Sequence, residues 1–195
     1  MNQALIIFTK NAEAGKVKTR LAATIGVDAA FAVFQKLSSY TQRIVTGLRA
    51  QKFVFYSDYI PADDLWPGEM FQKDIQQGIS LGERMSSAFA IAFKQQFERV
   101  VIIGTDCPGL DQTILEKAFE AEGDVILGPA ADGGYYLIGT NRHIPALFEN
   151  IHWSTPDVLS ETISICLASN LSYSLLPVLH DVDEEKDLVH LSKIN

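Results

Sequence analysis

Cysteine is scarce in this chain, and its scarcity excludes several classes of protein. Only Cys107 and Cys166 occur among the 195 residues. Two cysteines so far apart form neither the disulfide framework of a small secreted domain nor the closely spaced ligand set of a structural zinc site. Such cysteine usage is typical of a reducing compartment, and we therefore expect a cytoplasmic protein.

Long hydrophobic runs are missing as well. No stretch of the sequence is long and apolar enough for a transmembrane helix. Residues 1–10 contain no basic segment ahead of a long apolar core, so they lack the features of a signal peptide. We therefore expect a protein without a membrane span.

An excess of positive charge is also absent. The 16 Lys and Arg residues are outnumbered by 24 Asp and Glu residues, which gives a formal net charge of −8. General nucleic-acid binding requires a basic face, so we expect no nucleic-acid partner. A small anionic ligand is still compatible with this charge, provided that basic residues cluster locally.

What the chain does contain is typical of a globular α/β protein. Hydrophobic residues make up 47% and charged residues 21% of the sequence. Short apolar runs alternate with segments whose apolar residues recur at helical spacing, such as Val33, Leu37, Tyr40 and Ile44. No linker, repeat or low-complexity segment interrupts this pattern. We expect one domain over residues 1–195.

The stretch 99–110 combines a buried strand with a carboxylate at its end. Val100–Ile103 is a continuous β-branched run, which is typical of a parallel strand covered on both faces. In open α/β sheets, ligands bind outside the carboxyl ends of the strands, where Thr105 and Asp106 stand. The alternative role for Asp106 is to cap a turn or the next helix. Because Asp111 already occupies the N-cap position of that helix, we favour a ligand-binding Asp106.

A cluster of cations follows the first expected strand, residues 4–8. Gly15, Lys16, Lys18 and Arg20 lie in a stretch without acidic residues between Glu13 and Asp28. A glycine loop with three cations suits a polyphosphate, because backbone amides and side chains can both reach its oxygens. The loop fits neither the Walker A motif nor the dinucleotide-binding glycine fingerprint. A solvated surface loop is the alternative, and the charge pattern does not decide between the two.

Two further loops carry glycines beside polar residues. Gln77, Gly78 and Gly82 lie between a short strand and a helix, where glycine permits the close approach of a ligand. Asp132-Gly-Gly134 lies between two apolar strands. The second stretch is explained equally well by a plain β-hairpin.

The C-terminal third contains another helix start and a run of acids. Thr155 is a good N-cap and Pro156 a good first helical residue, whereas Trp153 either lines a pocket or closes the core. After a last strand within 172–179, Asp181 and Asp183 alternate on an extended segment, and a short helix then extends to Ile194.

Taken together, these motifs resemble those of a known family. They are Lys10, Gly15–Leu21, Leu81–Met85, Gly104–Leu110, Gly128–Gly139, Trp153–Thr155 and Asp181–Asp183. In this order they are similar to the bacterial GT-A-type glycosyltransferase-like proteins of undefined substrate. That family is related in fold to 2-phospholactate guanylyltransferase and to the molybdenum-cofactor guanylyltransferases.

The resemblance implies a nucleotide-diphospho-sugar transferase fold of the GT-A, Rossmann-like type. This is a three-layer α/β/α arrangement with a mostly parallel mixed sheet, which binds a nucleotide at the carboxyl ends of its N-terminal half. It also implies a divalent metal held by an aspartate near the middle of the chain. The fold serves both glycosyl and nucleotidyl transfer, so the reaction stays open.

The resemblance and the residue patterns together predict a site with four parts. We expect Asp106 and Asp183 to hold Mg²⁺ or Mn²⁺ against the phosphates of a nucleotide. The expected nucleotide-binding residues are Lys10, Gly15, Lys16, Lys18, Arg20, Gln77, Gly78, Gly82, Thr105 and Asp106. The expected acceptor-binding residues are Asp132, Gly133, Gly134, Tyr135, Trp153 and Ser154, and the sequence does not decide whether Asp132 is instead a third metal ligand. The expected catalytic residues are Lys18, Arg20, Asp106 and Asp132.

The hypothesis is therefore a metal-dependent transferase with a nucleotide donor, either a nucleoside triphosphate or a nucleotide sugar, and a small-molecule acceptor. The alternative is a non-catalytic module on the same fold that binds a nucleotide or a partner. The sequence does not decide between a monomer and a homodimer. Cys107 invites interpretation as a nucleophile, but no base is placed to activate it, so we expect a small buried core residue.

Overall fold

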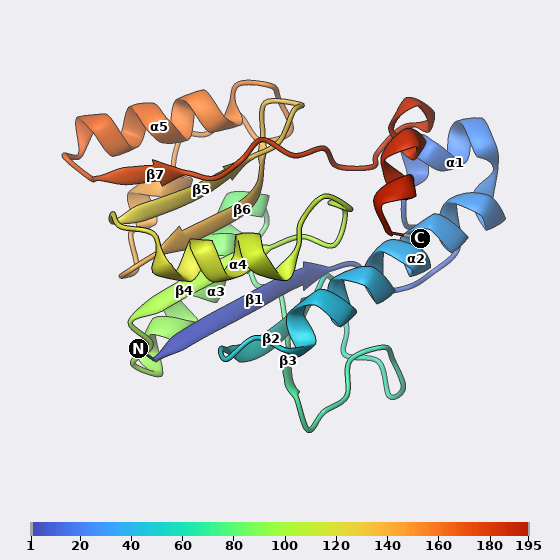
Figure 1. Ribbon diagram of the computed structural model, residues 1–195, viewed down its shortest axis with the longest axis horizontal. Helices are drawn as coiled ribbons and strands as arrows, with labels where there is room; N and C mark the ends of the chain where they lie inside the picture. The colour runs from blue at the N-terminus through green and yellow to red at the C-terminus, as the bar shows by residue number, and fades with distance from the viewer. Residues whose placement is uncertain (1, 195) are drawn as a thin grey trace.

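The computed structural model describes residues 2–194, in which one seven-stranded sheet has helices on both faces (Figure 1). The strands are β1 (Gln3–Thr9), β2 (Gln51–Tyr56), β3 (Phe71–Ile75), β4 (Arg99–Ile103), β5 (Val125–Pro129), β6 (Tyr135–Thr140) and β7 (Tyr173–Leu175), in the order β3-β2-β1-β4-β6-β5-β7. The α-helices are α1 (Thr19–Ile25), α2 (Val27–Thr46), α3 (Leu81–Lys94), α4 (Gln112–Glu120) and α5 (Val158–Ala168). Two 3₁₀ segments are η1 (Pro145–Phe148) and η2 (Glu185–Ile194).

Strand β1 shows how the sequence builds three layers. Its side chains alternate between the two faces of the sheet. Leu5 and Ile7 pack in the core that contains residues of α2 and α4, whereas Ala4 and Ile6 pack in the core that contains residues of α3 and α5. The expected three-layer α/β/α fold is therefore confirmed. Within residues 2–194, no helix has the length and apolar character needed to cross a membrane.

The sheet is parallel around β1 and changes direction beyond β4. Strand β1 pairs in parallel with β2 and β4, and β4 then pairs with β6 in antiparallel register, with Ile103 opposite Leu137. The carboxyl ends of β1 and β4 therefore lie at the same edge of the sheet as the start of β6. Ligands of open α/β sheets bind at this kind of edge.

The chain departs from the sequence prediction at three element boundaries. The cationic stretch is not all loop, because α1 begins at Thr19. Helix α5 begins at Val158 rather than at Pro156, since the Thr155 hydroxyl donates to the His152 carbonyl (2.7 Å) and closes a turn ahead of the helix. The expected last helix is a 3₁₀ segment, η2. After β7 the chain runs past the carboxyl ends of β5 and β4, where the Leu179 amide donates to the Pro129 carbonyl and the Val182 amide to the Asp106 carbonyl, and η2 then lies beside α1 (Figure 1).

Asp124 joins the starts of β5 and β7, and Asp124→Asn is expected to destabilise the protein by about 1 kcal/mol at pH 7. Its carboxylate accepts hydrogen bonds from the Ser172 amide (3.0 Å) and hydroxyl (2.9 Å) and from Arg142. The Arg142 guanidinium and these Ser172 donors hold the pKa of Asp124 well below its usual value of 3.8. Denaturant unfolding of both proteins measures the difference.

The sign of the pH dependence follows from the lowered pKa. The contribution of Asp124 is complete above the pKa of the unfolded chain and is lost as the pH falls toward the lower pKa of the folded state. The gap between wild type and Asp124→Asn should therefore be constant above about pH 5 and shrink below about pH 4. A gap that is unchanged down to pH 3 would contradict this assignment.

Candidate functional site

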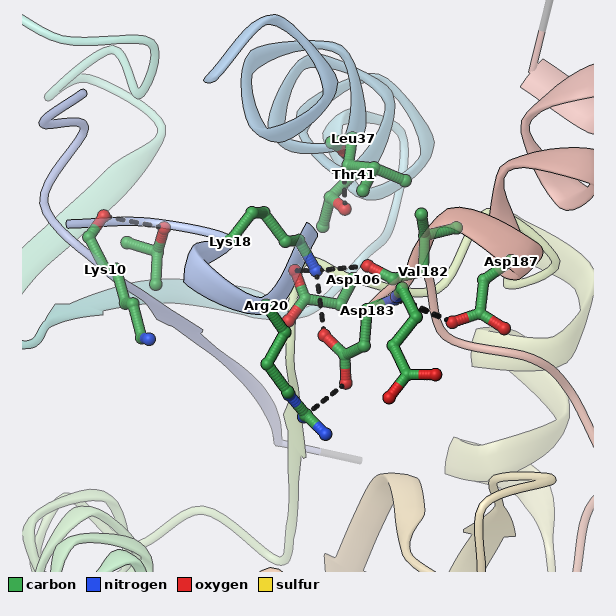
Figure 2. A network of polar contacts seen from close by, with 11 residues as sticks. Lys10, Lys18, Arg20, Leu37, Thr41, Asp106, Val182, Asp183 and Asp187 are labelled. Atoms are coloured by element: carbon green, nitrogen blue, oxygen red, sulfur yellow. Dashed lines mark hydrogen bonds and ion pairs between the residues drawn. The ribbon is translucent and has the colours of Figure 1, made fainter. Parts of the chain in front are cut away.

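The ammonium of Lys18 is the centre of the polar network at this sheet edge (Figure 2). Lys18 directly precedes α1 in the left-handed backbone conformation (φ 49°, ψ 42°), which residues other than glycine seldom adopt. Its Nζ donates to the Val182 carbonyl (2.6 Å) and contacts Asp106 Oδ1 at 2.7 Å and Asp183 Oδ1 at 3.2 Å. Three oxygens thus match the three N–H donors of one ammonium group.

Three distant parts of the chain meet at this ammonium. Asp106 comes from the loop after β4, and Asp183 from the C-terminal segment that crosses the sheet. The Val182 amide donates to the Asp106 carbonyl (2.9 Å), which fixes the two segments to each other. Arg20, in the first turn of α1, adds a second cation, because its Nη2 lies 3.2 Å from Asp183 Oδ2.

The two carboxylates keep Lys18 charged. Burial by itself lowers the pKa of an ammonium, but the charges and hydrogen bonds of Asp106 and Asp183 outweigh it, so the pKa of Lys18 lies above its usual value. The Lys18 side chain is 4% exposed, compared with 44% for Asp106 and 34% for Asp183. The carboxylates therefore remain accessible from solvent on the side away from Lys18.

Asp181 is a half-buried acid at this site with a buried Oδ1, and the sequence prediction did not include it. Burial, followed by the negative charges of Asp106, Asp183 and Asp132, raises the pKa of Asp181 to about 7. Its Oδ1 has no hydrogen-bond partner among residues 2–194. The Asp-x-Asp pattern drew attention to Asp181, but a pattern of alternation cannot tell the buried carboxylate from the accessible one.

Cys107 lies buried next to this acid. Burial and the neighbouring Asp181 raise the pKa of the Cys107 thiol, and both cysteines of the chain are free and buried. A thiol in this state is a poor nucleophile, because the thiolate is the reactive form. The structure agrees with the expectation of a buried, structural cysteine.

A cavity of about 410 Å³ opens beside the Lys18 network, at the ends of β1 and β4 and the start of β6. Of the residues expected to bind nucleotide, acceptor or metal, seven line it: Lys10, Lys18, Arg20, Thr105, Asp106, Tyr135 and Asp183. The Lys10 side chain stands apart from the ion-pair network (Figure 2). The volume lies in the range of small-molecule sites.

Gln76 and Leu81 also line the cavity, and neither was among the expected site residues. The Gln76 amide nitrogen donates to the Phe55 carbonyl (2.9 Å) and the Thr9 carbonyl (3.3 Å), which holds it at the ends of β1 and β2. Arg84 in turn donates to the Gln76 side-chain oxygen (3.3 Å). The sequence prediction chose the next residue, Gln77, because nothing in the sequence distinguishes the two adjacent glutamines.

The remaining expected site residues lie outside this cavity. Among the described residues, these are Gly15, Lys16, Gln77, Gly78, Gly82, Asp132, Gly133, Gly134, Trp153 and Ser154. Lys16 forms an exposed ion pair with Glu13 at 2.6 Å. Gly82 has a packing role, since a Cβ there would lie 2.7 Å from the Trp153 ring. Their roles toward nucleotide or acceptor stay predictions.

The Asp132 turn is stabilised by bonds within the chain. Asp132 Oδ1 accepts from the Gly134 amide (3.0 Å), and the Gly133 carbonyl accepts from the Leu159 amide at the start of α5 (2.9 Å). The first bond closes the turn, and the second joins the β5–β6 hairpin to α5. Asp132 itself is exposed, and its charge still reaches Asp181.

The donor set at Lys18 is compatible with a hard divalent cation. Asp106 Oδ1 and Asp183 Oδ1 converge on one point, since both contact the same Nζ. Carboxylate oxygens are the ligands that Mg²⁺ takes, typically one or two from the protein together with substrate phosphates. Within residues 2–194, no group of three or more His, Cys, Asp or Glu side chains is placed to hold a metal by itself. These residues therefore fit an ion shared with a ligand, not a closed protein cage.

Comparison with known proteins places the chain in a family. Residues 40–155 match the family described as "Uncharacterized protein conserved in bacteria (DUF2064)". The chain belongs to this family. The matched region includes Asp106, the Asp132 turn and Trp153, whereas Lys18, Arg20 and Asp183 lie outside it. No curated protein matches the sequence at a significant level.

Solved structures agree with the family assignment. The chain is 33% identical to a candidate nucleotide-diphospho-sugar transferase from Desulfovibrio desulfuricans G20, with a TM-score of 0.85 over 94% of this chain and 84% of that one. Two structures with far lower identity share the fold. They are the inositol-1-phosphate CTP transferase of T. maritima (13% identity, TM-score 0.54, covering 99% and 96%) and the 4-diphosphocytidyl-2C-methyl-D-erythritol synthase of Anaerococcus prevotii DSM 20548 (10% identity, TM-score 0.58, covering 96% and 93%). The resemblance to a GT-A-like fold of undefined substrate is confirmed.

Proposed function

We propose that this DUF2064 protein is a transferase with a nucleotide donor, which transfers a nucleotidyl or glycosyl group to a small acceptor. Its one domain works in the cytoplasm, with Mg²⁺ or Mn²⁺ held between Asp106, Asp183 and the donor phosphates. The observation that carries the proposal is the convergence of these two carboxylates with Lys18 and Arg20 beside a cavity of about 410 Å³. The transferases with the same fold support it.

The charges around the cavity suit a polyphosphate only when a cation joins it. Lys18 and Arg20 formally balance the two charges of Asp106 and Asp183, so of the cations that line the cavity only Lys10 is left to offset the several negative charges of a polyphosphate. A divalent ion supplies the missing positive charge and polarises the phosphate oxygens. Arg20 is 69% exposed and Lys10 has no ion pair within residues 2–194, so both cations are available to the donor. At the wall of the cavity, Arg20 and Lys10 would stabilise the negative charge that develops on the leaving phosphate.

The two transfer reactions release different products. In nucleotidyl transfer, an acceptor oxygen bonds to the α-phosphorus of a nucleoside triphosphate, and the α–β bond breaks to release pyrophosphate. In glycosyl transfer, the acceptor bonds to the anomeric carbon of a nucleotide sugar, and the bond to phosphate breaks to release a nucleoside diphosphate. In both, the acceptor hydroxyl loses its proton. The basic residues at 10–20 support a nucleoside triphosphate as the donor. The similarity to the candidate nucleotide-diphospho-sugar transferase from D. desulfuricans supports a nucleotide sugar.

Thermal unfolding with a panel of nucleoside triphosphates and nucleotide sugars, each with and without Mg²⁺, tests the proposal. A donor at about 100 times its Kd stabilises by about 2.7 kcal/mol, so we expect one class to raise Tm by roughly 5–10 °C, with a larger rise in Mg²⁺. Asp183→Asn should remove the part that depends on Mg²⁺. If no nucleotide raises Tm, the proposal fails. Assays for pyrophosphate and for nucleoside diphosphate then separate the two reactions.

A second candidate is a module that binds a nucleotide without turnover. The ammonium of Lys18 favours it, because this cation already bridges the two carboxylates that a metal would join. If the protein is such a module, a donor should raise Tm, but no acceptor should lead to the release of pyrophosphate or of a nucleoside diphosphate. It also expects Asp183→Asn to bind the donor as wild type does, so a loss of measured transfer in that variant would exclude it.

A further inference from the structure

A second cavity, of about 470 Å³, lies on the α2 side of β1 and is separate from the phosphate site proposed above. Its walls come from α2, from the ends of β1 and β2, and from residues 59–66 of the connection between β2 and β3. The two cavities share only Thr9, Lys10 and Phe34 in their linings. The proposed transfer does not involve this second cavity.

The β2–β3 connection is long and irregular, yet polar side chains fix it at both ends. Asn11 is 4% exposed, and its side chain bonds to the Tyr59 carbonyl (2.8 Å) and the Asp58 amide (3.1 Å). Asp64 accepts from the Trp66 amide (2.8 Å), from Lys73 (2.8 Å) and from the Tyr56 hydroxyl. Long loops with such order are uncommon and are usually functional. The hydrogen bonds of Asn11 and Asp64 therefore fix the loop that forms this wall of the cavity.

Ser38 leaves an unmet hydrogen bond at the wall of this cavity. The residue lies in α2, lines the cavity and is 6% exposed. Its Oγ has no hydrogen-bond partner within residues 2–194. A buried hydroxyl without a partner is unfavourable, and a helix offers it an easy partner in the carbonyl four residues earlier. If the Ser38 side chain rotates toward the cavity, a ligand bound there can form the hydrogen bond that the Ser38 hydroxyl lacks.

The other free groups of the lining offer both donors and acceptors. Lys10 and Asp63 carry opposite charges, and neither forms an ion pair within residues 2–194. Gln35 and Ser39 add neutral groups that both donate and accept. Aromatic side chains complete the wall: Phe34, Tyr56, Tyr59 and Trp66. The lining therefore favours neither an anion nor a cation.

We propose that this cavity binds a monosaccharide or a similar neutral polyol. Hydroxyl groups of a sugar both donate and accept, which matches Ser38, Gln35 and Asp63, and its C–H faces can pack on the exposed ring of Tyr59, with Trp66 behind it in the wall. A small zwitterion would satisfy the two charges but would leave Ser38 and the rings without a match. The cavity adjoins the nucleotide site, with which it shares Thr9, Lys10 and Phe34, but sugar binding needs neither donor nor metal.

Saturation-transfer difference NMR without nucleotide or metal tests this, with glucose, galactose, mannose and N-acetylglucosamine as probes. We expect at least one to bind with a Kd of about 1–10 mM, which is ordinary for so small a ligand. Ser38→Ala and Asp63→Asn should each weaken binding about 5- to 10-fold, because each removes one hydrogen bond. Ser164→Ala, a helical serine of α5 whose hydroxyl bonds to the Ser160 carbonyl (2.8 Å), is the matched control and should bind as wild type does.

Two further readouts separate a ligand role from a structural one. Ser38→Ala should unfold at the same Tm as wild type or higher, because it removes an unpaired hydroxyl and favours the helix. The sugar should shift the indole N–H signal of Trp66 and leave that of Trp153, the other tryptophan, unchanged. The proposal is overturned if no sugar binds, if glycine binds in place of the sugars, if Ser38→Ala lowers Tm, or if the signal of Trp153 shifts instead. Since no nucleotide is present, none of these outcomes bears on the proposed transfer.

Discussion

Lys18→Met is expected to lower Tm by about 5–10 °C, which corresponds to a loss of about 2–3 kcal/mol. Removing the ammonium leaves Asp106 and Asp183 without the cation that they share and the Val182 carbonyl without its donor. The loss of one partner from a buried ion pair costs roughly 3–5 kcal/mol, and the partial exposure of both carboxylates reduces that figure. Calorimetry or denaturant unfolding of the metal-free protein measures the difference.

Lys16→Met is the matched control for this substitution. It removes the same side chain two residues earlier, where the Lys16 ammonium is exposed and pairs only with Glu13. Its Tm should equal that of wild type within error, because exposed ion pairs contribute little. The double variant Lys18→Met with Asp183→Asn should regain part of the loss, since it removes one of the two unpaired carboxylates. Equal Tm values for Lys18→Met and Lys16→Met would refute the central role given to Lys18.

Gly133→Ala is expected to destabilise the protein by about 3–4 kcal/mol, or roughly 10 °C in Tm. Gly133 has a φ of 92°, which an alanine adopts only with strain. A Cβ at this position would lie 2.1 Å from the Pro156 carbonyl oxygen, so the backbone before α5 would have to move. Thermal unfolding measures the effect directly.

Gly134→Ala tests whether the effect is local to that close approach. The neighbouring glycine does not have a positive φ, and a Cβ there would meet only Asp132 Oδ1, at 3.3 Å, as its nearest neighbour. We expect a change of less than about 1 kcal/mol, because the Asp132 side chain can move. If both glycines tolerate alanine equally, the contact between the hairpin and the segment before α5 is not as close as described.

The sequence was sufficient to predict the layers of this fold. The apolar run in β1 and the β-branched run in β4 are local properties, and both predict strands that are buried on both faces of a sheet. The N-cap role of Asp111 was equally readable, since its side chain accepts from the Ile114 amide three residues later (2.8 Å). Asp106 was then left without a local partner. That made it a site candidate, and it lies at the expected sheet edge.

The boundaries of elements were less predictable where tertiary contacts decide them. Local propensity favoured Thr155 and Pro156 as the start of α5, but the Thr155 hydroxyl closes a turn with His152 and the Leu159 amide donates to the distant Gly133 carbonyl, so α5 starts later. Helix α1 begins directly after Lys18, whose left-handed backbone is compatible with three tertiary contacts of its side chain. Gly133 is distant in sequence from Leu159, and Asp106, Val182 and Asp183 are distant from Lys18, so no local pattern could reveal these two helix starts.

The sequence by itself determined that Asp106 follows a buried strand, that Lys18 belongs to a cluster of cations after the first strand, and that Asp183 is one of two acids after the last strand. Only the tertiary structure decided how they combine. It placed the Lys18 ammonium within 3.2 Å of both carboxylates, buried Asp181 beside them and turned Lys16 outward to Glu13. The physical reason is that charge pairing depends on distance and burial, and residues 18, 106 and 183 are far apart in the sequence and close together only in the folded chain.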